Sequence, residues 1–410
     1  MPAKISPFLA LKVGHFRNYL LGSLISEIGN QMQVVAVAWQ IYEITRNPAF
    51  LGFIGVANLL PIIIFSLFGG LLADKVDRRK LLILSLMMQM ILAFILFALT
   101  WSHQINPWLI YLILILVATA QSFSVPARAA VLPNLVPKAY FMNAVSLHTL
   151  QFQSATMIGP AIAGILIATA GVSLVYLFNA LSFLVFIITV FYINVPLHVE
   201  KKDVSFSLMS ILEGVKFVFK TPILYTTMAL DFLATFFGTA TILMPIFAQD
   251  VLHVGPSGLG LLYSAPAIGG VLAGVLMSFI HRIKAQGRVI IAAVILYGLS
   301  TIGFGLSKSL PISLLFLILV GFGDMSSTII RNTIRQMVTP DYLRGRMVSV
   351  MRIFFQGGPQ LGEIEAGFLA KAIGGPASVV VGGVGTVVIT ALVAWRSKSL
   401  RKYQGKELAV

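Results

Sequence analysis

The sequence predicts an all-α membrane protein with twelve transmembrane helices, arranged as two parallel-repeat six-helix bundles. Three observations predict it. The chain of 410 residues is 58% hydrophobic and only 10% charged, whereas soluble domains carry about 25% charged residues. Apolar runs long enough to span a bilayer recur along the whole chain. A segment of the first half also resembles a segment of the second half at a fixed spacing.

The predicted spans are apolar runs of about 20 residues or more, the length that crosses the hydrocarbon core of a bilayer as a helix. Strands are not expected, because the runs are long and lack a two-residue alternation. The spans are 17–44, 51–73, 80–101, 107–127, 141–170, 173–195, 222–249, 257–281, 287–307, 310–332, 342–373 and 376–395.

Lysine and arginine residues give these spans an orientation. The formal net charge is +15. If the spans alternate in direction from a cytoplasmic N-terminus, 26 of the 29 Lys and Arg residues fall on the cytoplasmic side, and only Arg46, Lys308 and Lys371 fall outside. The positive-inside rule therefore places both termini in the cytoplasm. The same rule explains the basic charge, so no nucleic-acid partner is expected.

Four segments follow from this order of spans. The longest interior loop contains a stretch whose apolar residues share one helical face, with Glu213, Lys216 and Lys220 on another. This pattern is typical of a helix on the membrane surface. The predicted segments are an N-terminal bundle at 1–195, a cytoplasmic linker with this helix at 196–221, a C-terminal bundle at 222–396 and a cytoplasmic tail at 397–410.

An internal repeat relates the two bundles. A shift of 203 residues aligns 127–147 with 330–350, so that Arg128 meets Arg331. The register continues without a gap to Gly171, which meets Gly374. The paired helices run in the same direction, so the repeat is parallel, with its axis along the membrane normal. Bundles related in this way place a solute path at their interface.

The loop between the second and third spans carries a motif. Gly70, Asp74, Arg78 and Arg79 form the pattern G-x-L-A-D-[KR]-x-x-R-R. Glycine allows close helix approach, and an aspartate at a helix end can cap a neighbouring helix or pair with arginine. We expect a gating loop; the alternative is an ordinary basic loop held in the cytoplasm.

This motif resembles the loop motif of the Major Facilitator Superfamily. Together with the segments 16–33, 339–350 and 362–370, it resembles the bacterial drug:proton antiporter branch that contains enterobactin and macrolide exporters. Exporters of this kind carry a fifth-helix motif, which is present in part here as Gly159, Pro160 and Gly164. The resemblance covers nearly the whole chain and implies alternating-access transport out of the cell.

Polar residues within the spans are the candidates for a solute or proton path, because a charge at the bilayer centre costs roughly 2.5–3.5 kcal/mol on insertion scales. A structural hydrogen-bonded or ion-paired network is the alternative for each. Arginines near the cytoplasmic ends are candidates for a gate or an ion pair. The path candidates are Glu27, Asn30, Gln31, His148, Gln151, Asp231, Asp324, Glu363 and Glu365, and the gate candidates are Arg128, Arg331 and Arg352.

The energy source is predicted by elimination. The sequence has no phosphate-binding loop, no nucleophile elbow, no zinc motif of the H-E-x-x-H type and no cysteine. We therefore expect no enzyme activity, cofactor or metal, and transport that is either passive or driven by an ion gradient. The hypothesis is a proton site at Glu27, Asp231 or one of the two glutamates at 363 and 365.

These observations favour a secondary transporter of the bacterial inner membrane. Its partners would be a small amphipathic solute, drug-like or siderophore-like, a proton and the lipid bilayer, and it would function as a monomer. Two alternatives stay open. One is a nutrient importer or facilitator with the same fold, and the other is a sensor or scaffold that transports nothing.

Overall fold

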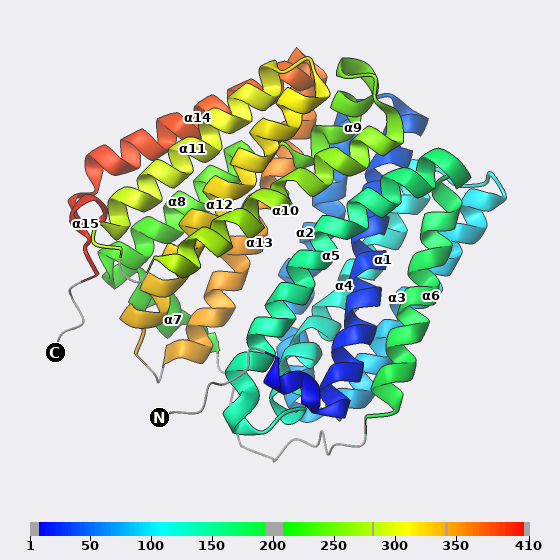
Figure 1. The fold of residues 1–410 in the computed structure, drawn as a ribbon, viewed down its shortest axis with the longest axis horizontal. Coiled ribbons are helices and arrows are strands. Elements are labelled where there is room, and N and C mark those ends of the chain that lie inside the picture. Colours follow the sequence, from blue (N-terminus) through cyan, green and yellow to red (C-terminus); the bar gives the residue numbers. More distant parts are fainter. Residues whose placement is uncertain (1–7, 194–207, 281–282, 341–342, 406–410) are drawn as a thin grey trace. The chain divides into compact units, whose positions relative to one another are not determined.

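The computed structural model describes residues 8–193, 208–280, 283–340 and 343–405. Within these ranges the regular elements are helices and no strand occurs (Figure 1). The helices of the first half are α1 (Gly14–Thr45), α2 (Pro48–Lys75), α3 (Arg78–Trp101), α4 (Pro107–Val131), α5 (Phe141–Ala170) and α6 (Val172–Phe191). Those of the second half are α7 (Leu208–Lys220), α8 (Pro222–Gly238), α9 (Met244–Ile246), α10 (Gly255–Phe279), α11 (Gln286–Leu306), α12 (Leu310–Val338), α13 (Arg344–Ile373), α14 (Gly375–Arg396) and α15 (Lys398–Lys402).

The predicted fold class, a helical protein that crosses the membrane many times, is confirmed. Ten helical segments of the described chain are long and apolar enough to cross a membrane. They correspond to ten of the twelve predicted spans. The other two predicted spans, 17–44 and 342–373, correspond to α1 and α13, which are 32 and 30 residues long.

The predicted span 222–249 lies within one candidate crossing segment, Pro222–Val251, but this segment is not one continuous helix. Helix α8 ends at Gly238, and the chain continues through a short 3-10 helix, α9 and a π-helix over Phe247–Val251. Pro245 contributes to the break, because it has no N–H to donate to the preceding turn and its ring clashes with that turn. At Gly238, a side chain would collide with the ring of Tyr297, so the helix end is also a close contact.

The chain divides into two compact units. Unit 1 comprises residues 1–44 and 60–204, and unit 2 comprises residues 45–59 and 205–410. In unit 1, α3 packs against α4 and α6 (Figure 1). In unit 2, α12 packs between α10 and α11, α14 lies along α11, and α8 contacts both α13 and α14. The predicted bundle boundaries differ from these units in residues 45–59 and stay a prediction.

The backbone repeats at the spacing found in the sequence. Gly171 is the single residue between α5 and α6, and Gly374 is the single residue between α13 and α14. Their φ and ψ angles are 84° and 168°, and 89° and 154°. Only glycine adopts this region readily. Two residues 203 positions apart therefore make the same sharp connection between successive helices.

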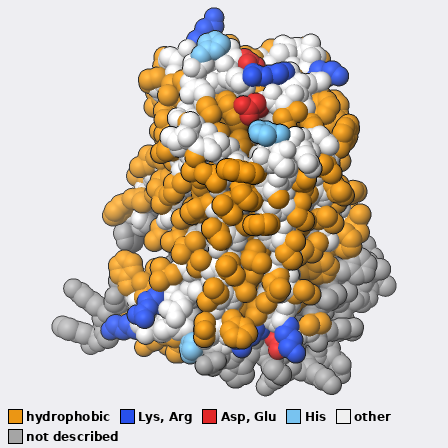
Figure 2. All heavy atoms as spheres, turned by 90° about the vertical axis from the view of Figure 1, so that its right-hand side faces the viewer, with side chains coloured by type: hydrophobic (Ala, Val, Ile, Leu, Met, Phe, Trp, Pro, Cys, Tyr) orange, Lys and Arg blue, Asp and Glu red, His pale blue; other side chains and the backbone are white. Residues whose placement is uncertain are grey.

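The surface has the distribution expected of a membrane protein. On the face drawn in Figure 2, hydrophobic side chains cover the middle, while Lys, Arg, Asp and Glu lie toward the two ends. Large apolar side chains such as Leu84, Phe94 and Leu181 are exposed. Lipid chains can cover such a surface, whereas a soluble protein rarely exposes so large an apolar area.

Glycines set a close helix crossing in unit 2. A Cβ atom at Gly269 of α10 would collide with the carbonyl oxygen of Ile318 on α12, and one at Gly321 of α12 would collide with the carbonyl oxygen of Pro266 on α10. Backbones approach this closely only where side chains are absent. The crossing of α10 and α12 therefore depends on both glycines.

Gly269→Ala should destabilise the protein by about 1–3 kcal/mol, because the new methyl group overpacks a backbone contact. Gly274→Ala is the matched control on the same helix, since nothing lies within 4 Å of a Cβ placed there. Thermal unfolding of both variants in detergent is the measurement. Equal melting temperatures for the two variants would show that the crossing is not tightly packed.

Candidate functional site

The predicted acid of the first helix forms an ion pair in unit 1. Glu27 on α1 lies 3.6 Å from Arg128 on α4, measured between Oε2 and Nη1. The Gln31 side chain, one turn further along α1, donates a hydrogen bond of 3.3 Å to Glu27 Oε1. The guanidinium carbon of Arg128 lies 4.9 Å from the ring centre of Phe186. Glu27 and Gln31 thus belong to one polar cluster, and the adjacent candidate Asn30 is partly buried.

Helix α5 fixes the position of this cluster. A Cβ atom at Gly159 would lie 2.7 Å from the Cβ of Gln31 and 2.9 Å from the carbonyl oxygen of Ile28. The predicted fifth-helix motif therefore contacts α1 directly beside the cluster. Pro160 and Gly164 are buried on the same helix.

Two further candidates on α5 lie near this contact. His148 is partly buried and within electrostatic range of both Glu27 and Arg128. Gln151 is buried, and its Oε1 has no hydrogen-bond partner among the described residues. Gln151 therefore retains an unused hydrogen-bond acceptor beside this contact.

A more deeply buried cluster lies in unit 2. Asp231 on α8 faces two arginines of α12, with Oδ1 lying 2.5 Å from Arg331 Nη2 and Oδ2 lying 3.5 Å from Arg335 Nη2. The side chains are 8%, 2% and 1% exposed, respectively. A buried pair of this kind resists the loss of either partner, because the remaining charge would be left without solvation.

Each arginine of this cluster is also held by its own helix. Arg331 donates a hydrogen bond of 2.8 Å to Thr328, and Arg335 donates one of 3.2 Å to Asn332. Arg335 also lies over the ring of Phe355 on α13, 4.2 Å from its centre. Both guanidinium groups are therefore held by contacts that do not involve the Asp231 carboxylate.

The two clusters are related by the internal repeat. Arg331 stands 203 residues after Arg128, and Asp231 stands 204 residues after Glu27. In each unit an acid on the first spanning helix pairs with an arginine on the fourth. Arg335 has no such counterpart, because Leu132 stands 203 residues before it. Arg335 lies outside the predicted set of residues, although it stands one helical turn after Arg331.

The other predicted acids of unit 2 differ in their distance from the Asp231 cluster and in the contacts of their carboxyl groups. Asp324 lies 3.9 Å from Arg331, with its side chain half exposed. Glu363 on α13 is partly buried, and its Oε2 is buried without a hydrogen-bond partner in the described chain. Glu365 is partly buried as well. Glu363 is therefore the acid whose surroundings offer it the least compensation.

Asp324 and Glu363 line one cavity inside unit 2. Its volume is about 220 Å³, and it is bounded by α8, α10, α11, α12 and α13. Its wall combines the two carboxyl groups with Tyr297, Thr301 and several threonines at the broken end of α8, together with apolar side chains. Glu365 is not among the described residues that line it. One of the two acids that line the cavity lies near an arginine, and the other has no ion-pair partner in the described part of the chain.

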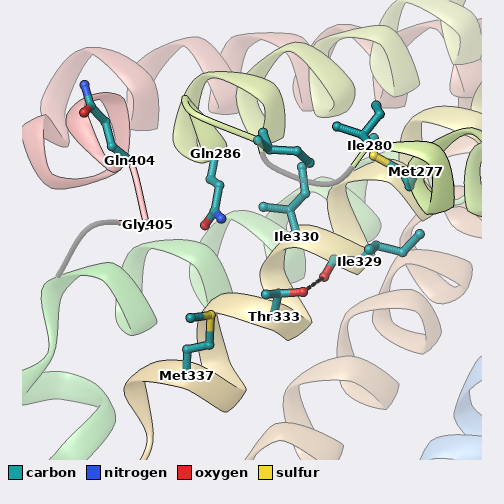
Figure 3. Close-up of a pocket in the computed structure, with 10 residues that line it drawn as sticks. Met277, Ile280, Gln286, Ile329, Ile330, Thr333, Met337, Gln404 and Gly405 are labelled. Carbon is teal, nitrogen blue, oxygen red and sulfur yellow. Dashed lines mark hydrogen bonds between the residues drawn. The ribbon is translucent and has the colours of Figure 1, made fainter. Parts of the chain in front are cut away.

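A second cavity of unit 2 has no charged wall among the described residues that line it. Its volume is about 340 Å³, and Figure 3 shows it beside α12, with Gln286, Gln404 and Gly405 on one side and Thr333 and Met337 on the other. The Thr333 hydroxyl is already used, because it donates a hydrogen bond of 2.9 Å to the carbonyl of Ile329. This cavity offers little to hold an ion.

The loop motif is ordered by a residue outside the predicted set. Asp77 caps α3, since its Oδ1 accepts hydrogen bonds from the N–H groups of Arg79 and Lys80. Arg78 donates to the carbonyl of Ala130 at 3.3 Å, which ties α3 to α4. The contacts of Gly70 and the side chains of Asp74 and Arg352 lie outside the described part of the structure, so their predicted roles stay predictions.

The comparisons with known proteins agree on the kind of molecule. The family model described as transmembrane secretion effector matches residues 5–409. The chain is 24% identical over 393 residues to the staphyloferrin A transporter of Staphylococcus aureus, covering 93% of this chain and 96% of that one. It is 26% identical over 366 residues to the multidrug efflux pump Tap of Mycolicibacterium fortuitum, covering 87% and 89%. It is 25% identical over 392 residues to the enterobactin exporter EntS of Citrobacter koseri, covering 95% and 93%.

Solved structures show the same fold. A point mutant of the nucleoside transporter NupG superposes with a TM-score of 0.75 at 13% identity, covering 93% of this chain and 99% of that one. A bacterial homologue of the lysosomal transporter Spinster gives 0.75 at 15% identity, covering 94% and 97%. With the helical fold and the family match over nearly its full length, the chain belongs to the transmembrane secretion effector family of the Major Facilitator Superfamily and is a secondary transporter of small compounds, not an enzyme.

Proposed function

We propose that this transporter exports a small amphipathic compound from the cell in exchange for protons. The observation that carries the proposal is the cavity of unit 2 that both acids line, where Glu363 has a buried oxygen without a described partner and Asp324 is part of the same wall. Burying a charge without compensation is costly, and binding a proton removes that charge. A carboxyl group in such a cavity is suited to load and release a proton as its access changes.

The other acids are less suited to this role. Asp231 is held between two arginines, and Glu27 is held by one. An arginine beside a carboxylate favours its charged form. The repeat-related ion pairs are therefore proposed to join helices within each unit, which develops the ion-pair interpretation of Arg128 and Arg331. The proton site is proposed at Glu363, with Asp324 as its neighbour.

The direction and the solute class are inferred from the relatives. Two of them are named for efflux or export, of several drugs in one case and of enterobactin in the other, and a third is named as a transporter of staphyloferrin A. The partial fifth-helix motif at Gly159, Pro160 and Gly164 also favours export. A solute with polar groups on an apolar frame fits this set of relatives.

The location is proposed to be the bacterial inner membrane, with both termini in the cytoplasm and a single chain as the functional unit. The distribution of 26 of the 29 basic residues on one side supports the orientation. An importer or facilitator of the same fold is the competing function. A facilitator would transport its solute without a pH gradient, so the coupling experiment distinguishes it from the proposed exporter.

Proton coupling is tested in proteoliposomes with labelled solutes and an imposed pH gradient. The unaltered protein should accumulate a solute against its concentration only when the gradient is present. Glu363→Gln should abolish this accumulation while retaining solute exchange across equal concentrations, because the path remains but the proton site is lost. Glu365→Gln is the matched control on the same helix.

Gradient-driven accumulation by Glu363→Gln at the rate of the unaltered protein would show that Glu363 is not the proton site. Accumulation that ignores the gradient in every variant would favour the facilitator instead.

The two ion pairs should differ in their effect on stability. Asp231→Asn leaves two buried guanidinium groups facing a neutral amide and should cost about 3–5 kcal/mol. Glu27→Gln should cost less, because that pair is longer and its side chains are 13% and 18% exposed. Thermal unfolding in detergent measures both.

A double variant isolates the cause of this loss. Adding Arg335→Gln to Asp231→Asn should restore part of the lost stability, because one uncompensated buried charge is removed. A double variant less stable than Asp231→Asn alone would show that Arg335 acts through its contact with Phe355 rather than through its charge.

A further inference from the structure

The last described segment of the chain is fixed to unit 2. Ser397 accepts a hydrogen bond of 3.2 Å from the N–H of Leu400 and so caps α15. The N–H of Gly287, at the start of α11, donates one of 3.3 Å to the carbonyl of Tyr403. Leu400 and Tyr403 are buried in the core cluster of the unit. The short helix α15 is therefore a fixed part of the bundle end, beside α11 and α14 (Figure 1).

This arrangement builds a basic cavity. Its volume is about 510 Å³, and four of its eight lining residues are cationic. One comes from the first turn of α11 and three from α15; they are Arg288, Lys398, Arg401 and Lys402. All four are exposed, and none has an ion-pair partner in the described part of the chain. No acidic residue of that part lines the cavity.

The rest of the cavity wall is apolar and lies deeper along the spanning helices. Ile291, Ala292 and Ile295 follow Arg288 on α11, and Ala394 lies on α14. At 1.5 Å per residue, Ile295 is about 10 Å further along the helix axis than Arg288. Trp395, next to Ala394, is 74% exposed, as is common for tryptophan at a membrane surface. Positive charge therefore stands at the membrane surface, with an apolar wall directed toward the hydrocarbon.

We propose that this cavity binds the headgroup of an anionic phospholipid. The phosphodiester would lie among the four cations. Basic pockets of this kind bind acidic lipid headgroups in other membrane proteins. The acyl chains would lie along the apolar wall of α11 and α14. A free phosphate would use the cations alone and leave the apolar wall uncovered, so the combination favours a lipid. This inference depends on neither the proposed proton site nor the direction of transport.

The charge pattern also gives the site a specificity. A zwitterionic headgroup carries its own ammonium group, which the four cations of the cavity would repel. Phosphatidylglycerol and cardiolipin carry only negative charge, so they should be retained in preference to phosphatidylcholine. The cavity differs in this respect from the nearby cavity of Figure 3, whose described wall contains glutamine and apolar residues without a cation.

Lipid binding is tested with delipidated protein in detergent, to which phosphatidylglycerol or phosphatidylcholine is added and the bound lipid is counted by native mass spectrometry. Each basic residue near a lipid headgroup contributes about 1 kcal/mol, or about fivefold in affinity. Arg401→Gln combined with Lys402→Gln should therefore weaken phosphatidylglycerol binding at least about tenfold. Lys284→Gln combined with Arg396→Gln is the matched control, because both residues are exposed near this end of the bundle but do not line the cavity.

The outcomes separate the alternatives. Selective loss in the cavity variant, with the control within about twofold of the unaltered protein, supports the site. An equal loss in both double variants would show general surface attraction and overturn it. Displacement of bound phosphatidylglycerol by millimolar inorganic phosphate would assign the cavity to a free anion and overturn the lipid proposal. Solute exchange in proteoliposomes should remain measurable in both variants, which confirms that they are folded.

Discussion

A buried acid paired with an arginine on another helix is the interaction on which each half of this protein depends. The hydrocarbon of a bilayer offers no water to a charged group, so a carboxylate on a spanning helix must find its partner inside the bundle. In unit 1 the first helix is joined in this way to the fourth, and in unit 2 the corresponding helices are joined by Asp231 and Arg331. The glycine contacts then determine how closely the other helices can pack around these joints.

The two halves use this interaction differently. Unit 1 has one acid and one arginine, partly exposed, within reach of a histidine. Unit 2 adds a second arginine and two further acids, and both of these acids line a cavity. The ion pair in unit 2 is therefore buried and held by two arginines. The ion pair in unit 1 lies near Gln151, whose Oε1 has no hydrogen-bond partner in the described chain. The two repeat-related halves therefore differ in the polar groups that surround their ion pairs.

Much of the fold could be predicted from the sequence, because each apolar run indicates a span and each basic loop indicates its orientation without information on distant residues. The ends of α5 and α14 lie within two residues of their predicted positions. The break after Gly238 was not predicted although Pro245 lies in the span, because proline also occurs inside spans that stay helical, such as Pro160 in α5. The site was predicted only as a set of residues. Glu27 and Arg128 are 101 positions apart, and no pattern in a single sequence shows that two such side chains meet.

The irregular segment after α8 coincides with a difference in length between the two halves. From Glu27 to Arg46, which follows α1 with a φ of 50°, is 19 residues. From Asp231 to His253, which has a φ of 54° at the matching connection, is 22 residues. Three extra residues in a regular helix would lengthen it by about 4.5 Å and rotate everything beyond them by about 300°. The 3-10 helix over Thr241–Leu243 and the π-helix over Phe247–Val251 lie in this longer stretch, so the extra residues coincide with the departure from a regular α-helix.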